Sequence, residues 1–253
     1  MIVHQTQNGW QIIYHRAHAL LAAQIAGHWR RSDAPPRLYE IVAAISQHDD
    51  LAKEWESDNL TEVGTPKDFL MDEGDSYEPL RKHIEQSLYR GHWVALLTSM
   101  HMSHLNVSKR GTSAEADAFL DEQAENQARW RKEAEASQED ADSAYAFMQW
   151  CDRLSLILCQ HELPMDERAL EISKGPDGQR YDVIQHRDGL VTVTPWCFEE
   201  DRFTVNVEVT SLSQVTFETN DRLVEALKQS PRQFLKWTFV KADPEAMQEN
   251  PLS

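Results

Sequence analysis

Residues 38–50 read LYEIVAAISQHDD, an apolar run that ends in three chargeable side chains. The apolar residues are too dense for a helix on the surface, so the segment is predicted to be a buried helix that reaches His48. Asp49 and Asp50 follow, and such charges are costly beside a core unless they are solvated, paired or bound to a cation. The segment therefore indicates a helical core with a polar site at the end of one helix.

Other parts of the chain also carry helical periodicity. Apolar residues at helical spacing predict core helices over 15–31, 80–106 and 144–161. The highly charged residues 112–140 are typical of an exposed helix or helical hairpin. Residues 53–79 are rich in Asp, Glu, Gly and Pro, which indicates a long loop of the kind that often covers a site.

The pattern becomes extended after Pro164. Residues 180–186 and 190–196 flank Asp188-Gly189, a pair suited to a tight hairpin turn. Residues 203–209 alternate apolar and polar side chains, as a half-buried strand does. Further strands are predicted at 10–14, 215–218 and 233–240. A helix capped by Asn220 is predicted at 220–229, and the tail at 242–253 is expected to be frayed.

These elements predict a mainly α protein, a helical bundle with a small C-terminal antiparallel β-rich appendage, and thus α+β overall. The expected division is a helical domain at residues 1–163 and a β-rich subdomain at 164–253. A chain of 253 residues is long enough for a large core and such an appendage.

Composition limits the partners. The formal net charge is −17 and there is no basic cluster, which argues against binding of long nucleic acid. A small phosphorylated substrate fits if a bound divalent cation reverses the local potential. The three cysteines lack CxxC spacing, and neither a signal peptide nor a membrane-spanning apolar run is present. A cytoplasmic protein without a membrane partner is expected, and a homodimer is compatible with these data.

Residues that can bind a metal are distributed over separate predicted helices. They are His18, the pair His48-Asp49, His101 and Asp152. Imidazole and carboxylate ligands suit divalent first-row metals. The expected cofactor is therefore a divalent transition metal, Fe, Mn, Ni or Zn, as one ion or two.

The order of these residues resembles the H…HD…D pattern of the HD superfamily of metal-dependent phosphohydrolases. The strings HALLAAQIAGHW, AAISQHDD, PKDF and WCDRLSLILC together resemble a bacterial HD-like family without an assigned function. The resemblance covers residues 1–161 and extends more loosely through TVTPWCF at 192–198. It implies an HD-domain-like helical bundle in which His18, His48, Asp49 and Asp152 bind the metal.

Two roles are open for each of several neighbouring residues. His101 and His104 share a helix face, so they either bind metal or hold a substrate phosphate. Asp50 is either a catalytic base, alongside Asp49, or a surface acid. Arg153 could neutralise a substrate phosphate or form a salt bridge, and Trp55 could wall a substrate pocket or simply pack. For His15 a surface or hydrogen-bonded core role is favoured.

The predicted function is metal-dependent hydrolysis, of the HD type, of a small phosphoester or nucleotide-like substrate. One alternative is a di-iron oxygenase on the same scaffold, which needs His101 and further ligands for a second ion. Another is a non-enzymatic, metal-stabilised binding module. Walker, GxSxG and dinucleotide-binding motifs are absent from the sequence, so the corresponding enzyme classes have no support.

Overall fold

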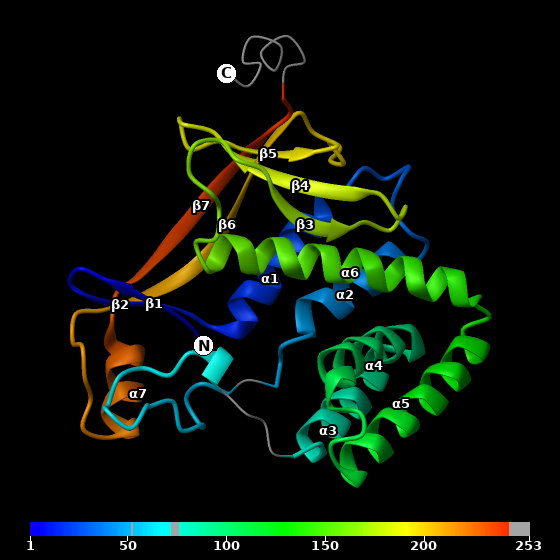
Figure 1. Ribbon diagram of the computed structural model, residues 1–253, viewed down its shortest axis with the longest axis horizontal. Helices are drawn as coiled ribbons and strands as arrows, with labels where there is room; N and C mark the ends of the chain where they lie inside the picture. The colour runs from blue at the N-terminus through cyan, green and yellow to red at the C-terminus, as the bar shows by residue number, and fades with distance from the viewer. Residues whose placement is uncertain (52, 72–75, 243–253) are drawn as a thin grey trace.

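The computed structural model describes residues 1–51, 53–71 and 76–242. One curled, mixed sheet runs through this part of the chain in the order β1-β2-β6-β7-β5-β4-β3 (Figure 1). Neighbouring strands are antiparallel except β5 and β7, which are parallel. The strands are β1 (Ile2–Thr6), β2 (Gly9–Ile13), β3 (Leu170–Lys174), β4 (Arg180–Gln185), β5 (Val191–Thr194), β6 (Arg202–Leu212) and β7 (Arg232–Val240).

The helices lie mostly between the second and third strands in sequence. They are α1 (His15–Gly27), α2 (Leu38–Gln47), α3 (Glu78–Ser87), α4 (His92–Asn106), α5 (Ala114–Glu133), α6 (Gln138–Cys159) and α7 (Asn220–Gln229). Short 3₁₀ helices occur at Phe69–Met71, Leu88–Arg90 and Val107–Lys109. In the described part of the chain, no helix is both long and apolar enough to cross a bilayer.

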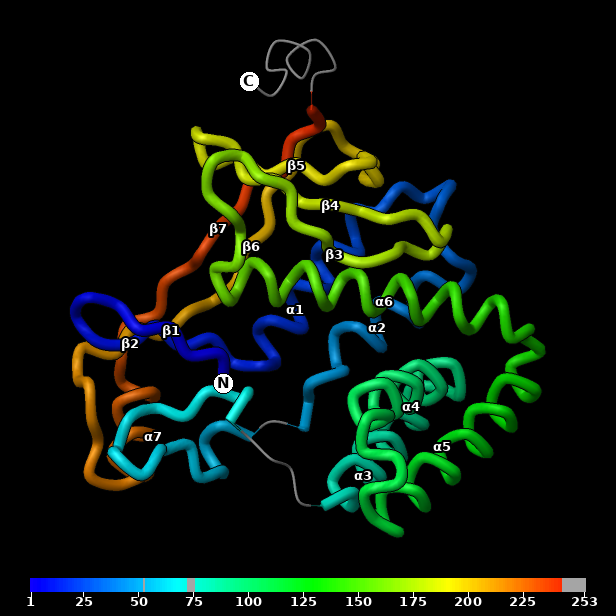
Figure 2. Tube along the Cα trace, in the orientation of Figure 1, coloured from blue at the N-terminus to red at the C-terminus, as the bar shows by residue number. Residues whose placement is uncertain are grey.

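The prediction of a mainly α bundle with a small β appendage is wrong. The protein is α+β with a large seven-stranded sheet, and the N-terminal hairpin β1–β2 belongs to it. Trp10 pairs with Leu212 across β2 and β6, so segments from opposite ends of the chain are neighbours, as Figure 2 also shows. Alternation of side chains identifies a strand locally but carries no information about a partner so distant in sequence.

The first and last long helices of the helical region cover the sheet. α1 packs against β6 and α6 packs against β3, whereas α3, α4 and α5 lie on the far side of α6 from β3, β4 and β5 (Figure 1). Gln24 of α1 exchanges two hydrogen bonds with the backbone of Asn206 in β6. Trp29 is fully buried against Phe147 and Phe198, which come from α6 and from the strand-rich region. The main apolar core therefore contains residues from both predicted domains, and the division at 163/164 stays a prediction.

Most predicted elements are present with shifted ends. The expected helix over 80–106 is interrupted at Gly91, whose φ of 122° is accessible chiefly to glycine, and becomes α3 and α4. α6 begins earlier than expected, at Gln138, because Ser137 and Asp140 form a capping box. Residues 215–218 form no strand, and Thr219 rather than Asn220 caps α7. β1 and β3 were not predicted, and the expected frayed tail lies almost wholly outside the described residues.

Candidate metal centre

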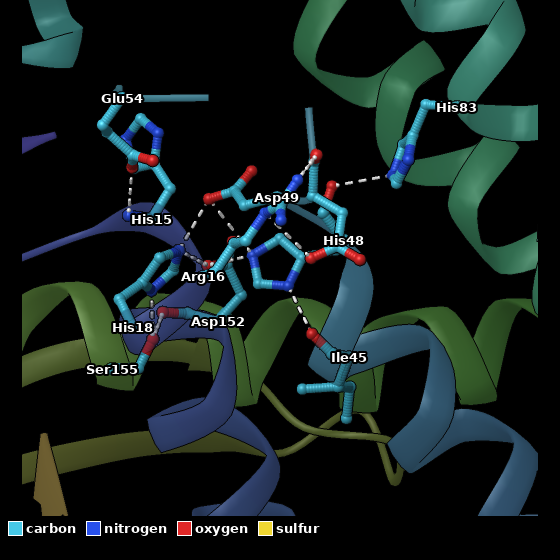
Figure 3. Close-up of polar contacts among 11 residues, drawn as sticks. His15, Arg16, His18, Ile45, His48, Asp49, Glu54, His83, Asp152 and Ser155 are labelled. Carbon is cyan, nitrogen blue, oxygen red and sulfur yellow. Dashed lines mark hydrogen bonds and ion pairs between the residues drawn. The ribbon is translucent and has the colours of Figure 1, made fainter. Parts of the chain in front are cut away.

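Four of the predicted ligands meet at one point. His18 comes from α1, His48 and Asp49 follow the end of α2, and Asp152 comes from α6 (Figure 3). The Nε2 atom of His18 lies 2.7 Å from Oδ2 of Asp49 and 3.8 Å from Oδ1 of Asp152. The Nε2 atom of His48 lies 3.1 Å from Oδ1 of Asp152 and 3.6 Å from Oδ2 of Asp49. Two imidazole nitrogens thus face two carboxylate oxygens, and we call these four side chains the His/Asp cluster.

Hydrogen bonds behind the cluster fix the orientation of both rings. Ser155 donates its hydroxyl proton to the backbone carbonyl of Asp152, so its oxygen accepts from Nδ1 of His18 at 2.8 Å. The Nδ1 atom of His48 donates to the carbonyl of Ile45 at 2.6 Å. Each ring therefore carries a proton on Nδ1 and directs Nε2 at the carboxylates. A lone pair on Nε2 cannot face a carboxylate oxygen favourably unless a proton or a metal ion lies between them.

The electrostatics agree with this arrangement. His48 is almost fully buried, and burial opposes its protonation, but Asp49 and Asp152 outweigh that effect and raise its pKa to about 10. Burial also favours a neutral Asp49, yet His48 and His18 hold the pKa of this carboxyl well below its ordinary value. The pKa of Asp152 is lowered in the same way, against burial and chiefly by His48. The two carboxylates of the centre are therefore anionic, and a proton or a metal ion between them and the Nε2 atoms supplies the positive charge that they need.

His101 lies at the edge of the cluster. Its ring centroid is 5.0 Å from that of His48, and its side chain is buried. Its Nδ1 atom has no hydrogen-bond partner in the described part of the chain. Burial, together with the charge on His48, lowers the pKa of His101 to about 4, which leaves a neutral imidazole. Neutral imidazole is the form that binds metals.

Two sets of three residues bring their ligand atoms within 4.8 Å of one another. One set is His18, His48 and Asp152, and the other is His48, Asp49 and His101. Both sets use His48, whose Nδ1 is occupied by Ile45, so Nε2 is the nitrogen they share. One nitrogen lone pair binds one ion, and the two sets therefore describe a single centre among the described residues.

The remaining predicted site residues lie at different distances from this centre. Asp50 follows Asp49, and Arg16 donates to its backbone carbonyl at 2.7 Å and lies 3.5 Å from its carboxylate. His104 contacts Gln149 at 2.8 Å and lines a separate surface pocket. Arg153 forms an ion pair with Glu162 at 3.0 Å. The structure thus brings Asp50 next to the cluster, whereas the side chains of His104 and Arg153 are engaged elsewhere.

Sequence reasoning missed two residues that shape the site. Ser155 is three positions after Asp152, so the two share a helix face, and this spacing was the available signal. His15 borders the cluster, with its ring centroid 6.2 Å from that of His18. A surface or hydrogen-bonded core role was expected for His15, and its Nε2 is buried without a hydrogen-bond partner among the described residues. No local pattern distinguishes such a histidine from one paired in the core.

Comparison with known proteins identifies the family. A family model described as "Protein of unknown function (DUF3891)" matches residues 1–214. The chain belongs to the DUF3891 family. Its match covers β1 to β6 and thus includes every member of the His/Asp cluster. No curated protein and no solved structure matches the chain.

Membership of the DUF3891 family corrects the earlier resemblance. The match to the HD superfamily is wrong, because no HD model matches and the fold is a set of helices on a curled seven-stranded sheet. The H…HD…D order was carried by few residues, and an HD dipeptide after an apolar helix occurs in unrelated folds. For this DUF3891 protein, function must be argued from the geometry of the cluster.

Proposed function

We propose that the His/Asp cluster binds one divalent transition metal ion and that the protein is a metal-dependent hydrolase of a small phosphoester. The observation that carries the proposal is the orientation of His18 and His48. Both rings donate Nδ1–H to the protein and aim Nε2 at carboxylate oxygens 2.7 and 3.1 Å away. Two neutral imidazoles and two carboxylates would neutralise a divalent ion, which favours Fe, Mn, Ni or Zn.

The ligand roles follow from the contacts. His18, His48, Asp49 and Asp152 would hold the ion, and His101 offers a fifth position from α4. Ser155 and the carbonyl of Ile45 orient the two imidazoles from behind, an arrangement that typically supports metal affinity. The side chain of Asp49 is 26% exposed whereas that of His18 is fully buried, so the centre is open to small molecules on the Asp49 side.

A divalent ion at this centre would lower the pKa of a bound water towards neutrality and polarise a phosphoryl oxygen. Asp50 is the candidate general base because it borders the cluster without contributing to it. Arg16 holds its backbone and lies near its carboxylate, which fixes its position. Asp49, which contacts His18 directly, is better suited to binding the ion than to accepting a proton.

Metal content is the first measurement. Protein purified without a His tag is compared by elemental analysis with Asp152→Asn and with Asp142→Asn, an exposed acid of the same helix. We expect about one equivalent of metal in the wild type and in Asp142→Asn, and loss in Asp152→Asn. Equal metal content in all three proteins would contradict the site. Two equivalents would favour a dinuclear, oxygen-dependent centre instead.

Hydrolysis is then tested with a phosphoester panel and the metal that was found. Asp50→Asn is expected to keep the metal and lose about 10²- to 10⁴-fold in kcat, the usual contribution of a general base. Asp49→Asn is expected to lose both metal and activity. A metal-loaded wild type that cleaves no phosphoester, and whose metal only raises its melting temperature, would support a metal-stabilised binding module instead.

A further inference from the structure

A pocket of about 300 Å³ is lined by residues close in sequence to members of the His/Asp cluster, such as Ala17, which precedes His18. Its walls include Tyr14, Arg16 and Ala17 from the start of α1, and Lys53 and Trp55 from the segment that follows Asp49 and Asp50. Residues 14–18, 48–50 and 53–56 therefore supply the pocket walls and three members of the cluster, His18, His48 and Asp49. A volume of this size lies at the lower end of the range for small-molecule sites.

A buried carboxylate links the pocket to the start of α1, the helix that carries His18. Glu54 lines the pocket and accepts a hydrogen bond from the backbone N–H of His15 at 2.9 Å. Arg16 also lines the pocket, and its guanidinium donates to the backbone carbonyl of Asp50, the residue after Asp49. A ligand that fills the pocket would thus have one end close to Arg16 and the proposed metal.

The pocket has an aromatic wall that is held in place. The indole N–H of Trp55 donates to the hydroxyl of Tyr14 at 3.2 Å, and the two rings meet edge to face with centroids 6.2 Å apart. Trp55 nevertheless remains 46% exposed. An oriented but exposed indole that lines a cavity is suited to contact a flat ring of a ligand.

Positive charge gathers around this wall in a chain whose net charge is −17. The ammonium group of Lys228 lies 5.0 Å from the ring centroid of Trp55, and the guanidinium of Arg232 lies 5.9 Å from that of Tyr14. Arg232 is paired with Glu208, and Lys53 with Glu56. Lys228 has no carboxylate partner among the described residues, whereas Arg16 is half exposed and lies 3.5 Å from the carboxylate of Asp50. The lining itself is balanced, with Arg16 and Lys53 against Glu54 and Glu56. Glu54 is occupied by the N–H of His15 and Glu56 by Lys53, so the ammonium of Lys228 beside the aromatic wall remains to attract an anion.

We propose that this pocket selects a substrate in which an aromatic ring carries a phosphate group. The ring lies against Trp55 and Tyr14, and the phosphate passes Arg16 to the His/Asp cluster. The inference rests on the proposed function, because it names the substrate class of the same centre. Trp55 and Arg16 are specificity residues in this arrangement, and neither belongs to the proposed set of metal ligands.

Binding of phosphonates tests the pocket without turnover, because a carbon–phosphorus bond is not a phosphoester. Phenylphosphonate and methylphosphonate carry the same charged group and differ in the ring. Their affinities are measured by calorimetry on the metal-loaded protein, on Trp55→Ala and on Tyr89→Ala, which removes an exposed aromatic side chain outside the pocket. Circular dichroism and melting curves check that each variant is folded.

The wild type and Tyr89→Ala are expected to bind phenylphosphonate about tenfold or more tightly than methylphosphonate, in line with the usual contribution of aromatic stacking. Trp55→Ala should lose most of this preference, and Arg16→Gln should weaken both ligands. No phenyl preference in the wild type, or an undiminished one in Trp55→Ala, would overturn the proposal.

A last arm separates the two proposals. If the phenyl preference depends on Trp55 but the metal-loaded wild type cleaves no phosphoester, the pocket is supported and the proposed hydrolase function is overturned. If phosphoesters are cleaved without discrimination between aryl and alkyl groups, the hydrolase function stands and the pocket inference is overturned.

Discussion

Ser155 determines which nitrogen of His18 faces the carboxylates. Its hydroxyl donates to the carbonyl of Asp152 and accepts from Nδ1 of His18, so one small side chain links two members of the cluster. Ser155 is fully buried, so its hydrogen bonds are shielded from bulk solvent. The chemistry of the site thus depends on a residue that would bind no metal itself.

Replacement of Ser155 tests this role. Ser155→Ala is expected to reduce metal affinity by about 10- to 100-fold, the usual effect of removing a group that orients a ligand, with the fold retained. Competition with a chromogenic chelator measures the affinity. Ser99→Ala is the matched control, because Ser99 is also buried but hydrogen-bonds Gln123 and Gln127 instead. Equal affinities in both variants would rule out the orienting role.

His15 gives the metal-free protein a pH-dependent stability. Burial is the main reason that its pKa falls from 6.5 to about 4. Between these values the unfolded chain binds a proton that the folded chain excludes, so the stability present above pH 6.5 is lost as the pH falls towards 4. His15→Gln removes this dependence.

Urea unfolding of the metal-free proteins at several pH values provides the test. The free energy of unfolding of the wild type, relative to His15→Gln, should be constant above pH 7 and fall between pH 6.5 and 4. A difference between wild type and His15→Gln that is independent of pH would disprove the assignment.

At the scale of single elements, α6 connects the site to the sheet, because it supplies Asp152 and Ser155 and also packs against β3. Its first turn is fixed by a capping box. The Ser137 oxygen accepts from the N–H of Asp140 at 3.1 Å, and the Asp140 carboxylate accepts from the N–H of Ser137 at 2.9 Å. This box explains why the helix begins before the apolar periodicity does.

Ser137→Ala should lower the free energy of unfolding by about 1 to 2 kcal/mol, as loss of a good N-cap does. Ser113→Ala, at the start of α5, is expected to cost less, since Ser113 only accepts from Ala116 whereas Ser137 also donates to Asp140. Chemical denaturation measures both. Metal content should be unchanged in both variants, because Asp152 lies several helical turns beyond Ser137 on α6. A loss of bound metal in Ser137→Ala would mean that the cap also positions the site.

At the scale of the whole molecule, the sheet ties both ends of the chain to the site. α1 begins directly after β2, and β2 is held by β6 through the pairs Trp10–Leu212 and Ile12–Thr210. His18 lies on this helix. The C-terminal strands therefore help to position a ligand encoded near the N-terminus.

Expression of residues 1–163 alone tests the predicted domain division. Without β6 and the Phe198 region, the edge of β2 and the side chain of Gln24 lose their partners, and Trp29 loses its contact with Phe198. We expect this fragment to unfold without cooperativity, to be cleaved rapidly by protease and to bind no metal. Co-expression with residues 164–253 is expected to restore cooperative unfolding, protease resistance and metal binding. A fragment that unfolds cooperatively and binds metal would establish residues 1–163 as a domain.

The sequence by itself determined the helices, most strands and the residues that form the cluster. Helical and strand periodicity is a local property, and the cost of burying His48, Asp49 and Asp152 near apolar runs was visible without a fold. It did not determine the size of the sheet, the role of Ser155 or the unpartnered nitrogen of His15. These depend on contacts between segments up to about two hundred residues apart, and only the tertiary structure decides which distant groups meet, because pairing and burial are properties of the folded chain as a whole.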